Sequence, residues 1–275
     1  MLTFTKVPND GYPAGADGGN MTLEEHEIYR AEQNRIHGIP NKLTRSKDRK
    51  VANAVSPNGK TATIANAFGL PSGKSFSCPS QTPFCGDICY AGKLEKVYKG
   101  VSAVLLRNWV ALKDASLSEM VELLSEMVAD FVADCDKRDA RKLFRIHWDG
   151  DFFSATYVAA WAKVIAAFPD VQFWAYTRVP TAAVFLHSRK LANLSLYFSA
   201  DPDNVDIARA LGDRGIKIAF VGKTFADGKA EFANATRCPE NNKAMPLISE
   251  QGSACVRCGL CVFGRKNVLF SASKK

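Results

Sequence analysis

The sequence contains no run of about 18 apolar residues, so we expect no membrane-spanning helix and no membrane partner. Residues 1–20 are polar and contain several glycines and prolines, so they lack the charged-then-apolar order of a signal peptide. Eight cysteines in 275 residues are too few for a small disulfide-rich scaffold. We therefore expect a cytoplasmic protein, in which clustered cysteines bind metal rather than form disulfides.

The sequence also has no internal repeat of solenoid length and no low-complexity segment. A hydrophobic content of 47% is that of a globular protein that can bury a full core. The net charge of +8 is compatible with a polyanionic partner such as nucleic acid. The basic residues are densest over residues 42–50, although such a stretch is also typical of a solvated linker.

Seven of the eight cysteines lie in two groups. The first group, which we call the thiol triad, has the spacing C-x6-C-x3-C and consists of Cys78, Cys85 and Cys89. The second group, the C-terminal quartet, has the spacing C-x16-C-x2-C-x2-C and consists of Cys238, Cys255, Cys258 and Cys261. Thiolates at such spacings are typical ligands of zinc or of an iron–sulfur cluster. Three ligands leave a coordination position open for a substrate or cofactor, whereas four close the site.

The sequence leaves the kind of metal open. The triad is compatible with a [4Fe–4S] cluster, or with a zinc ion whose fourth ligand is His147 or an aspartate. The quartet resembles ferredoxin ligation, because a C-x2-C-x2-C run is combined with a distant cysteine that Pro239 follows. Structural zinc is the alternative for the quartet. Cys135 stands alone on a predicted helix face, so we expect it to be a buried thiol without a ligand role.

The hydrophobic pattern divides the chain into three parts. Residues 1–60 are predicted to form an N-terminal extension, with a helix over 22–35 and a basic connector with a turn over 41–60. Residues 61–222 alternate between strand and helix patterns. Residues 223–275 no longer alternate between strand and helix patterns, and they carry the quartet. We interpret them as a C-terminal appendage that is stabilised by a bound metal.

The middle part predicts an α/β fold with parallel strands. Strands are predicted over 61–67, 143–148, 171–176, 194–199 and 216–221. Helices are predicted over 94–113, 117–135, 155–168, 181–191 and 205–214. Helical crossovers between apolar strands favour a parallel sheet that is buried on both faces. We interpret this part as a partial (β/α) barrel, similar to part of a TIM barrel, to which the C-terminal appendage is joined.

Polar residues follow the ends of three predicted strands, at the edge where α/β folds place their chemistry. The candidates are Asp149, Gly150, Asp151 and Ser154 after the second strand, Thr177 and Arg178 after the third, and Ser199 and Asp201 at the end of the fourth. The triad follows the first strand, so we expect it at the same edge. Asp149 and Asp151 could act in acid–base or nucleophilic catalysis, or could simply belong to a solvated turn.

The triad lies in a loop between a predicted strand and a predicted helix. This order resembles the layout of radical S-adenosylmethionine enzymes, although the usual cysteine spacing in those enzymes is C-x3-C-x2-C. The resemblance implies that the triad holds a [4Fe–4S] cluster whose fourth iron binds S-adenosylmethionine. It implies that Asp151 meets the amino nitrogen of this cofactor, beside Gly150. It also implies that a reductant protein, such as ferredoxin or flavodoxin, is a partner, and that the quartet binds a second cluster. Further cofactor contacts are expected from Ser154, Thr177, Arg178, Ser199 and Asp201.

The stretch from 145 to 178, together with the paired cysteine groups, resembles the actinobacteriophage gene-product-88 family over roughly residues 60–265. From these resemblances we predict an enzyme that cleaves S-adenosylmethionine reductively to a 5′-deoxyadenosyl radical, which abstracts hydrogen from a substrate. One alternative is a zinc-dependent, transglycosylase-like enzyme that modifies nucleic-acid bases, with Asp149 or Asp151 as nucleophile. The other is a metal-stabilised nucleic-acid-binding protein without catalytic activity, whose binding would depend on salt.

Overall fold

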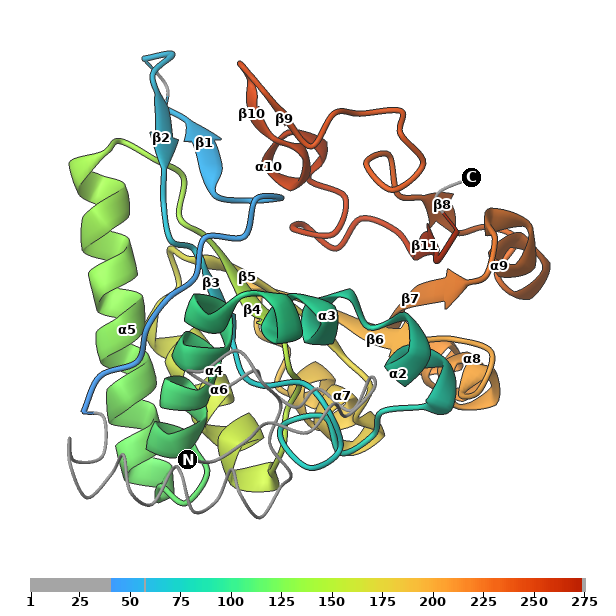
Figure 1. Ribbon diagram of the computed structural model, residues 1–275, viewed down its shortest axis with the longest axis horizontal. Helices are drawn as coiled ribbons and strands as arrows, with labels where there is room; N and C mark the ends of the chain where they lie inside the picture. The colour runs from blue at the N-terminus through green and yellow to red at the C-terminus, as the bar shows by residue number, and fades with distance from the viewer. Residues whose placement is uncertain (1–40, 57, 274–275) are drawn as a thin grey trace.

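Seven strands form one central sheet, in which every recorded pairing is parallel (Figure 1). The computed structural model describes residues 41–56 and 58–273. The order across the sheet is β3-β4-β5-β6-β7-β11-β8. The strands are β3 (Ala67–Gly69), β4 (Leu143–Asp149), β5 (Gln172–Thr177), β6 (Leu194–Ala200), β7 (Lys217–Gly222), β8 (Thr236–Arg237) and β11 (Val268–Ser271). The predicted α/β class with a parallel sheet is therefore confirmed.

One face of the sheet is covered by helices, and α6, α7 and α8 lie below the sheet in Figure 1. The helices are α5 (Leu117–Lys137), α6 (Ala155–Ala167), α7 (Pro180–Ser188) and α8 (Val205–Asp213). Helix α5 begins at a capping box, in which Ser116 and Glu119 satisfy each other's backbone N–H groups. Its buried stripe, which includes Leu124 and Phe131, packs against the same core as Phe144 of β4 and Phe173 of β5.

The C-terminal segment covers the other face of the sheet and lies above it in Figure 1. Leu143 and Trp174 project from the sheet into a cluster with Val51 and Val262. The segment contains the hairpin β9 (Ile248–Ser249) and β10 (Gly252–Ser253), and the helices α9 (Phe225–Glu231) and α10 (Ala254–Cys258). It also supplies β8 and β11 to the sheet, so it is joined to the α/β part by backbone pairing as well as by packing. The domain boundary at residue 222 stays a prediction.

The sheet is open in the part of the chain that the structure describes. The strands β3 and β8 stand at its two edges, and no pairing joins them across residues 41–56 and 58–273. A closed barrel would require such a pairing. The coarse fold is therefore an open α/β sheet, and the finer comparison with part of a TIM barrel stays a prediction.

Two predicted elements differ from those observed. The predicted strand over 61–67 is divided: β2 (Thr61–Thr63) pairs with β1 (Asn53–Val55) in an antiparallel hairpin, and only β3 joins the central sheet. The predicted helix over 94–113 is interrupted at Tyr98, whose extended backbone separates α3 (Tyr90–Val97) from α4 (Lys99–Leu112). The predicted helix over 22–35 lies outside the described residues. Within the described ranges, no helix combines the length and hydropathy needed to cross a bilayer.

Candidate metal centres beside the sheet

The loop that carries the start of the triad is packed against the turn that follows β4. The backbone N–H of Leu70 donates to the carbonyl of Asp149 over 3.0 Å, which fixes the start of the loop. A Cβ built on Gly150 would lie 2.4 Å from Oγ of Ser77 and 2.9 Å from the carbonyl oxygen of Leu70. Gly150 also has a φ of 82°, which favours glycine. Gly150 therefore allows the loop to pack closely against the turn that follows β4. The contact between Gly150 and a cofactor stays a prediction.

The three thiols of the triad lie on consecutive short segments. Cys78 lies in the loop, Cys85 in α2 (Pro83–Ile88), and Cys89 between α2 and α3. Thr82 caps α2, because its Oγ1 accepts a hydrogen bond from the N–H of Cys85 at 3.0 Å. The Sγ of Cys89 accepts a hydrogen bond from the N–H of Gly92 at 3.3 Å and so caps α3. All three cysteines are half-buried.

Burial raises the pKa of every thiol in the triad. The pKa of Cys85 rises to about 11 by burial, although the positive charge of Arg178 opposes the rise. Burial raises the pKa values of Cys78 and Cys89, with further rises from the carboxylates of Asp151 and Asp149 at Cys78 and from that of Asp149 at Cys89. Cys89 adds to the rise at both other thiols, which indicates that the three lie close enough to interact. The thiols are therefore protonated in the absence of a cation, and a bound metal would displace their protons.

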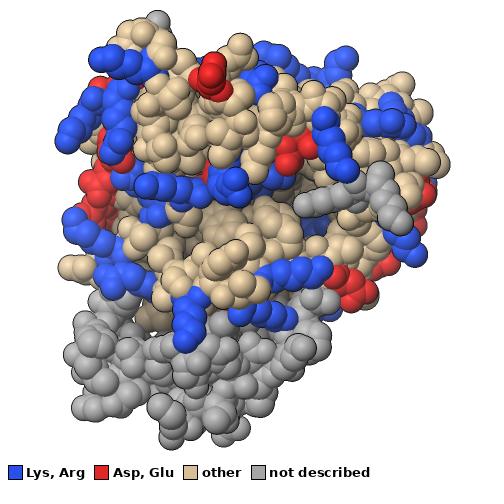
Figure 2. Space-filling model, turned by 45° about the horizontal axis from the view of Figure 1, so that its top comes forward, with Lys and Arg blue, Asp and Glu red and all other residues tan. Residues whose placement is uncertain are grey.

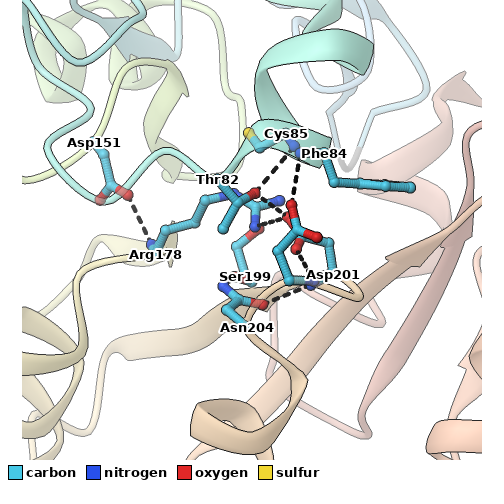
Figure 3. Close-up of polar contacts among 9 residues, drawn as sticks. Thr82, Phe84, Cys85, Asp151, Arg178, Ser199, Asp201 and Asn204 are labelled. Carbon is cyan, nitrogen blue, oxygen red and sulfur yellow. Dashed lines mark hydrogen bonds and ion pairs between the residues drawn. The ribbon is translucent and has the colours of Figure 1, made fainter.

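Predicted residues from the ends of three strands meet in one polar network (Figure 3). The carboxylate of Asp151 accepts hydrogen bonds from Oγ1 of Thr177 at 2.6 Å, from the N–H of Arg178 at 2.7 Å, and from the N–H of Phe152 at 2.7 Å. The guanidinium of Arg178 forms an ion pair with Asp201. Asp151 therefore has three donors within the chain, which hold the ends of β4 and β5 together.

The network extends from β6 to the helix that carries Cys85. Asp201 accepts a hydrogen bond from Oγ1 of Thr82 at 2.6 Å, and the N–H of Phe84 donates to Asp203 over 2.8 Å. These two bonds attach the first turn of α2 to the loop after β6. The loop itself is held by Asn204, whose Oδ1 accepts a hydrogen bond from the N–H of Asp201 at 2.8 Å. The position of α2 is thus set by contacts between residues that are far apart in the sequence.

Two predicted cofactor-binding serines have structural contacts. Oγ of Ser154 accepts a hydrogen bond from the N–H of Tyr157 at 3.1 Å and caps α6. The carbonyl of Ser199 accepts a hydrogen bond from Nδ2 of Asn204 at 3.3 Å. These contacts give each serine a role in the fold, and their contact with a cofactor stays a prediction.

Glu95 on α3 is a site residue that the sequence analysis did not identify. It is fully buried, and its Oε1 accepts hydrogen bonds from the N–H and Oγ of Ser72 at 3.0 and 2.6 Å. Oε2 of Glu95 and Oδ2 of Asp149 have no donor among the described residues, and the two carboxyl groups are close enough to share a proton. Burial raises the pKa of Asp149 to about 7 and that of Glu95 well above its usual range. A lone glutamate in an amphipathic helix gives no sequence signal for such a pair.

His147, considered above as a zinc ligand, lies in the aromatic core. Its φ of 58° breaks the alternation of β4, and its Nε2 lies 2.9 Å from the hydroxyl of Tyr157 on α6. The ring is in edge contact with Phe152. Burial, with the charge of Arg145 as a second cause, lowers the pKa of His147 to about 3. The imidazole is therefore neutral at physiological pH.

The quartet lies on the face of the sheet opposite the helices. Burial raises the pKa values of Cys255 and Cys261 to about 12 each, and the charge of Arg145 opposes both shifts. Cys261 interacts electrostatically with Cys255, and also with Cys238 and Cys258. The four cysteines that the sequence separates by up to 16 intervening residues are thus gathered around Cys261.

One buried arginine interacts with the quartet and with the residue that follows the triad. Arg145 forms an ion pair with Asp48, and its guanidinium carbon lies 5.6 Å from the ring centroid of Tyr176. Tyr176 packs against the same cluster of buried residues as Cys255 and Cys261. The charge of Arg145 also acts on the phenol of Tyr90, the residue that directly follows the last cysteine of the triad. The quartet and the residue after the triad are therefore within electrostatic range of the same buried cation.

The donors in both groups are thiols, which are soft ligands suited to zinc and to iron–sulfur clusters. Across residues 41–56 and 58–273, no three Cys, His, Asp or Glu side chains form a group that could hold a metal ion. The donor chemistry of the thiols fits zinc and an iron–sulfur cluster alike.

Comparison with known proteins identifies the family. The family described as gene product 88 matches residues 41–264. The chain belongs to the gene product 88 family. The Gene 88 protein of Mycobacterium phage L5 is 69% identical over 237 residues, which cover 85% of this chain and 99% of the relative. The Gene 88 protein of Mycobacterium phage D29 is 68% identical with the same coverage. No solved structure matches the chain.

Membership of the gene product 88 family confirms the resemblance predicted from the stretch between residues 145 and 178. The match includes the whole triad and the whole quartet. The names of the gene product 88 relatives state no activity. The resemblance to radical S-adenosylmethionine enzymes stays a prediction.

Proposed function

We propose that this protein is an iron–sulfur enzyme that binds S-adenosylmethionine at the triad. The supporting observation is that three half-buried, interacting thiols lie next to the polar network at the ends of β4, β5 and β6. Cys78, Cys85 and Cys89 would hold three irons of a [4Fe–4S] cluster and leave the fourth open. When bound, the cluster would supply an electron for the reductive cleavage of S-adenosylmethionine, after reduction by a protein such as ferredoxin or flavodoxin.

The acidic residues beside the triad would orient the cofactor. Asp149 is favoured for contact with the ammonium group, because its Oδ2 is buried and has no donor in the described residues. Asp151 uses its two oxygens to hold Thr177 and the backbone of Arg178, so it would act mainly by keeping the site in shape. Glu95 would keep a proton beside Asp149 until a cationic ligand displaces it.

The quartet would hold a second [4Fe–4S] cluster with every iron ligated by the chain. Its thiols pack against Tyr176 and Tyr197 on a covered face of the sheet. Four ligands leave no open position, so we assign this site to stability and electron storage rather than to cofactor binding.

The test is a metal count on protein purified without oxygen. Two clusters predict about eight irons per chain and a brown colour. The triple variant Cys78→Ala, Cys85→Ala, Cys89→Ala should lose about half of the iron. Cys135→Ala is the matched control, because Cys135 is a buried cysteine outside both groups, and it should keep all of the iron. A colourless protein with about two zinc ions would refute the proposal and favour the zinc-dependent alternative.

Cofactor binding is tested separately by calorimetry. Asp149→Asn should weaken S-adenosylmethionine binding roughly 10- to 150-fold, since a hydrogen bond to a charged group is worth about 1.5–3 kcal/mol. Asp170→Asn is the control, because Asp170 is exposed in the turn before β5. Equal affinity in the two variants would remove Asp149 from the cofactor site.

A further inference from the structure

Helices α3 and α4 present exposed charge of one sign only. Between residues 90 and 112 the sequence contains four basic residues and one acidic residue, Glu95. Because Glu95 is fully buried, it adds nothing to the surface. The basic residues are Lys93, Lys96, Lys99 and Arg107. An exposed surface with this charge is complementary to a polyanion.

The same segment exposes aromatic side chains. Tyr90 and Tyr98 are 51% and 56% exposed, and Val97 between them is 68% exposed. Among the large apolar side chains that are exposed in the described residues, two are tyrosines, and both lie on this segment. Tyrosine rings beside lysines are the combination on which single-stranded nucleic acids stack their bases, while the lysines pair with phosphates.

This surface borders the triad. Tyr90 directly follows Cys89, and its hydroxyl donates to the carbonyl of Trp148 at the end of β4 over 3.1 Å. Figure 2 shows a hollow between the C-terminal segment and the side of the molecule where Figure 1 places α2 and α3, with Lys and Arg side chains along its rim. A strand lying on α3 would therefore pass close to the triad.

We propose that α3 and α4 form a binding surface for single-stranded nucleic acid. Lys93 and Arg107 pair with the phosphates, and Tyr98 stacks on a base. Binding depends only on this surface and not on a metal. We also assign the bound strand as the substrate. This assignment rests on the proposed function, because a substrate role requires a reactive cofactor at the triad.

The test measures the binding of a fluorescent oligonucleotide of about 20 nucleotides, which exceeds the usual site of about 4–16 nucleotides per domain. The double variant Lys93→Glu, Arg107→Glu should weaken binding at least about tenfold, and the slope of log K against log salt should fall by roughly 1.4 for two lost phosphate contacts. The control Lys137→Glu, Lys163→Glu changes the net charge equally at exposed positions of α5 and α6. This control should lose much less affinity.

Tyr98→Ala tests stacking and should weaken binding roughly fivefold or more. Circular dichroism checks that every variant is folded. The proposal is overturned if the wild type does not bind, if the control loses as much affinity as the double variant, or if Tyr98→Ala binds a single strand as tightly as the wild type. Metal-free protein is measured in parallel: binding without iron supports this surface even where the iron count refutes the proposed function.

Discussion

The guanidinium of Arg178 forms an ion pair with the carboxylate of Asp201, and this pair connects the ends of β5 and β6 beneath the triad. The side chain of Asp201 is fully buried and that of Arg178 is 10% exposed. Asp201 also accepts a hydrogen bond from Thr82, which caps the helix that carries Cys85. A single buried ion pair therefore positions one ligand of the proposed metal centre.

Removal of this arginine should destabilise the fold. Arg178→Met leaves the carboxylate of Asp201 buried without its cation, which typically costs about 3–5 kcal/mol of unfolding free energy. Arg209→Met is the matched control, because the pairs of Arg209 with Asp206 and Glu231 are exposed and worth about 0–1 kcal/mol. Urea unfolding of the metal-free proteins measures both changes. Equal losses in the two variants would show that the Arg178 pair has no special role.

The contact at Gly150 predicts a second large loss of stability. Gly150→Ala combines a strained φ of 82° with a Cβ that lies 2.4 Å from Oγ of Ser77, and each effect costs about 1–3 kcal/mol. Gly59→Ala separates the two effects, since Gly59 has a φ of 79° but no atom within 4 Å of the added Cβ. We expect Gly150→Ala to lower the unfolding free energy clearly more than Gly59→Ala. A similar loss of unfolding free energy in both variants would mean that the loop carrying Ser77 can move away from the added Cβ without destabilising the fold.

The buried carboxyl pair predicts a dependence of stability on pH. The pKa of Asp149 is about 7 in the folded protein, against an ordinary value of 3.8, so between about pH 4 and 7 the folded protein binds more protons than the unfolded chain. The unfolding free energy therefore falls as pH rises through this range, by up to about 1.4 kcal/mol per pH unit for one proton. Glu95→Gln should flatten this slope, because it removes a carboxyl group that burial and Asp149 keep protonated in the folded protein and that is ionised in the unfolded chain.

This prediction is checked by urea unfolding of the metal-free protein between about pH 4.5 and 8. The depressed pKa of His147 gives a slope of opposite sign below about pH 6.5, but it is common to wild type and variant and cancels in their difference. Glu122→Gln on the exposed face of α5 is the control and should keep the wild-type slope. A wild-type slope in Glu95→Gln would show that the Glu95 carboxyl group adds no bound proton to the folded protein.

The sequence predicted the central strands well, because their apolar character follows from burial on both faces of a parallel sheet. The predicted strand over 194–199 is observed as Leu194–Ala200, and the predicted edge with its polar residues forms the network around Asp151. The strands β8 and β11 were not predicted, because each is at most 4 residues long and pairs with a distant partner. Such short strands are determined by tertiary pairing rather than by a periodic pattern.

The sequence predicted which residues belong to the candidate site better than it predicted the contacts between them. Strand ends indicated Asp149, Asp151, Thr177 and Arg178 as neighbours, since parallel strands end at one edge. The burial of Glu95 depends on how α3 lies against β4, which no local pattern encodes. The interaction of Arg145 with the quartet likewise depends on the C-terminal segment folding back over the sheet.

The last prediction separates the roles of the two cysteine groups. Cys85→Ala should abolish reductive cleavage of S-adenosylmethionine while the quartet keeps its metal, because the triad is the group with an open position. Cys258→Ala should lower the melting temperature and the iron content, yet leave cleavage at the triad at least partly active. Iron content, melting temperature and release of 5′-deoxyadenosine under dithionite distinguish the two variants, with Cys135→Ala as the control. If Cys258→Ala abolishes cleavage in folded protein whose triad is loaded with iron, the quartet takes part in catalysis and this division of roles is wrong.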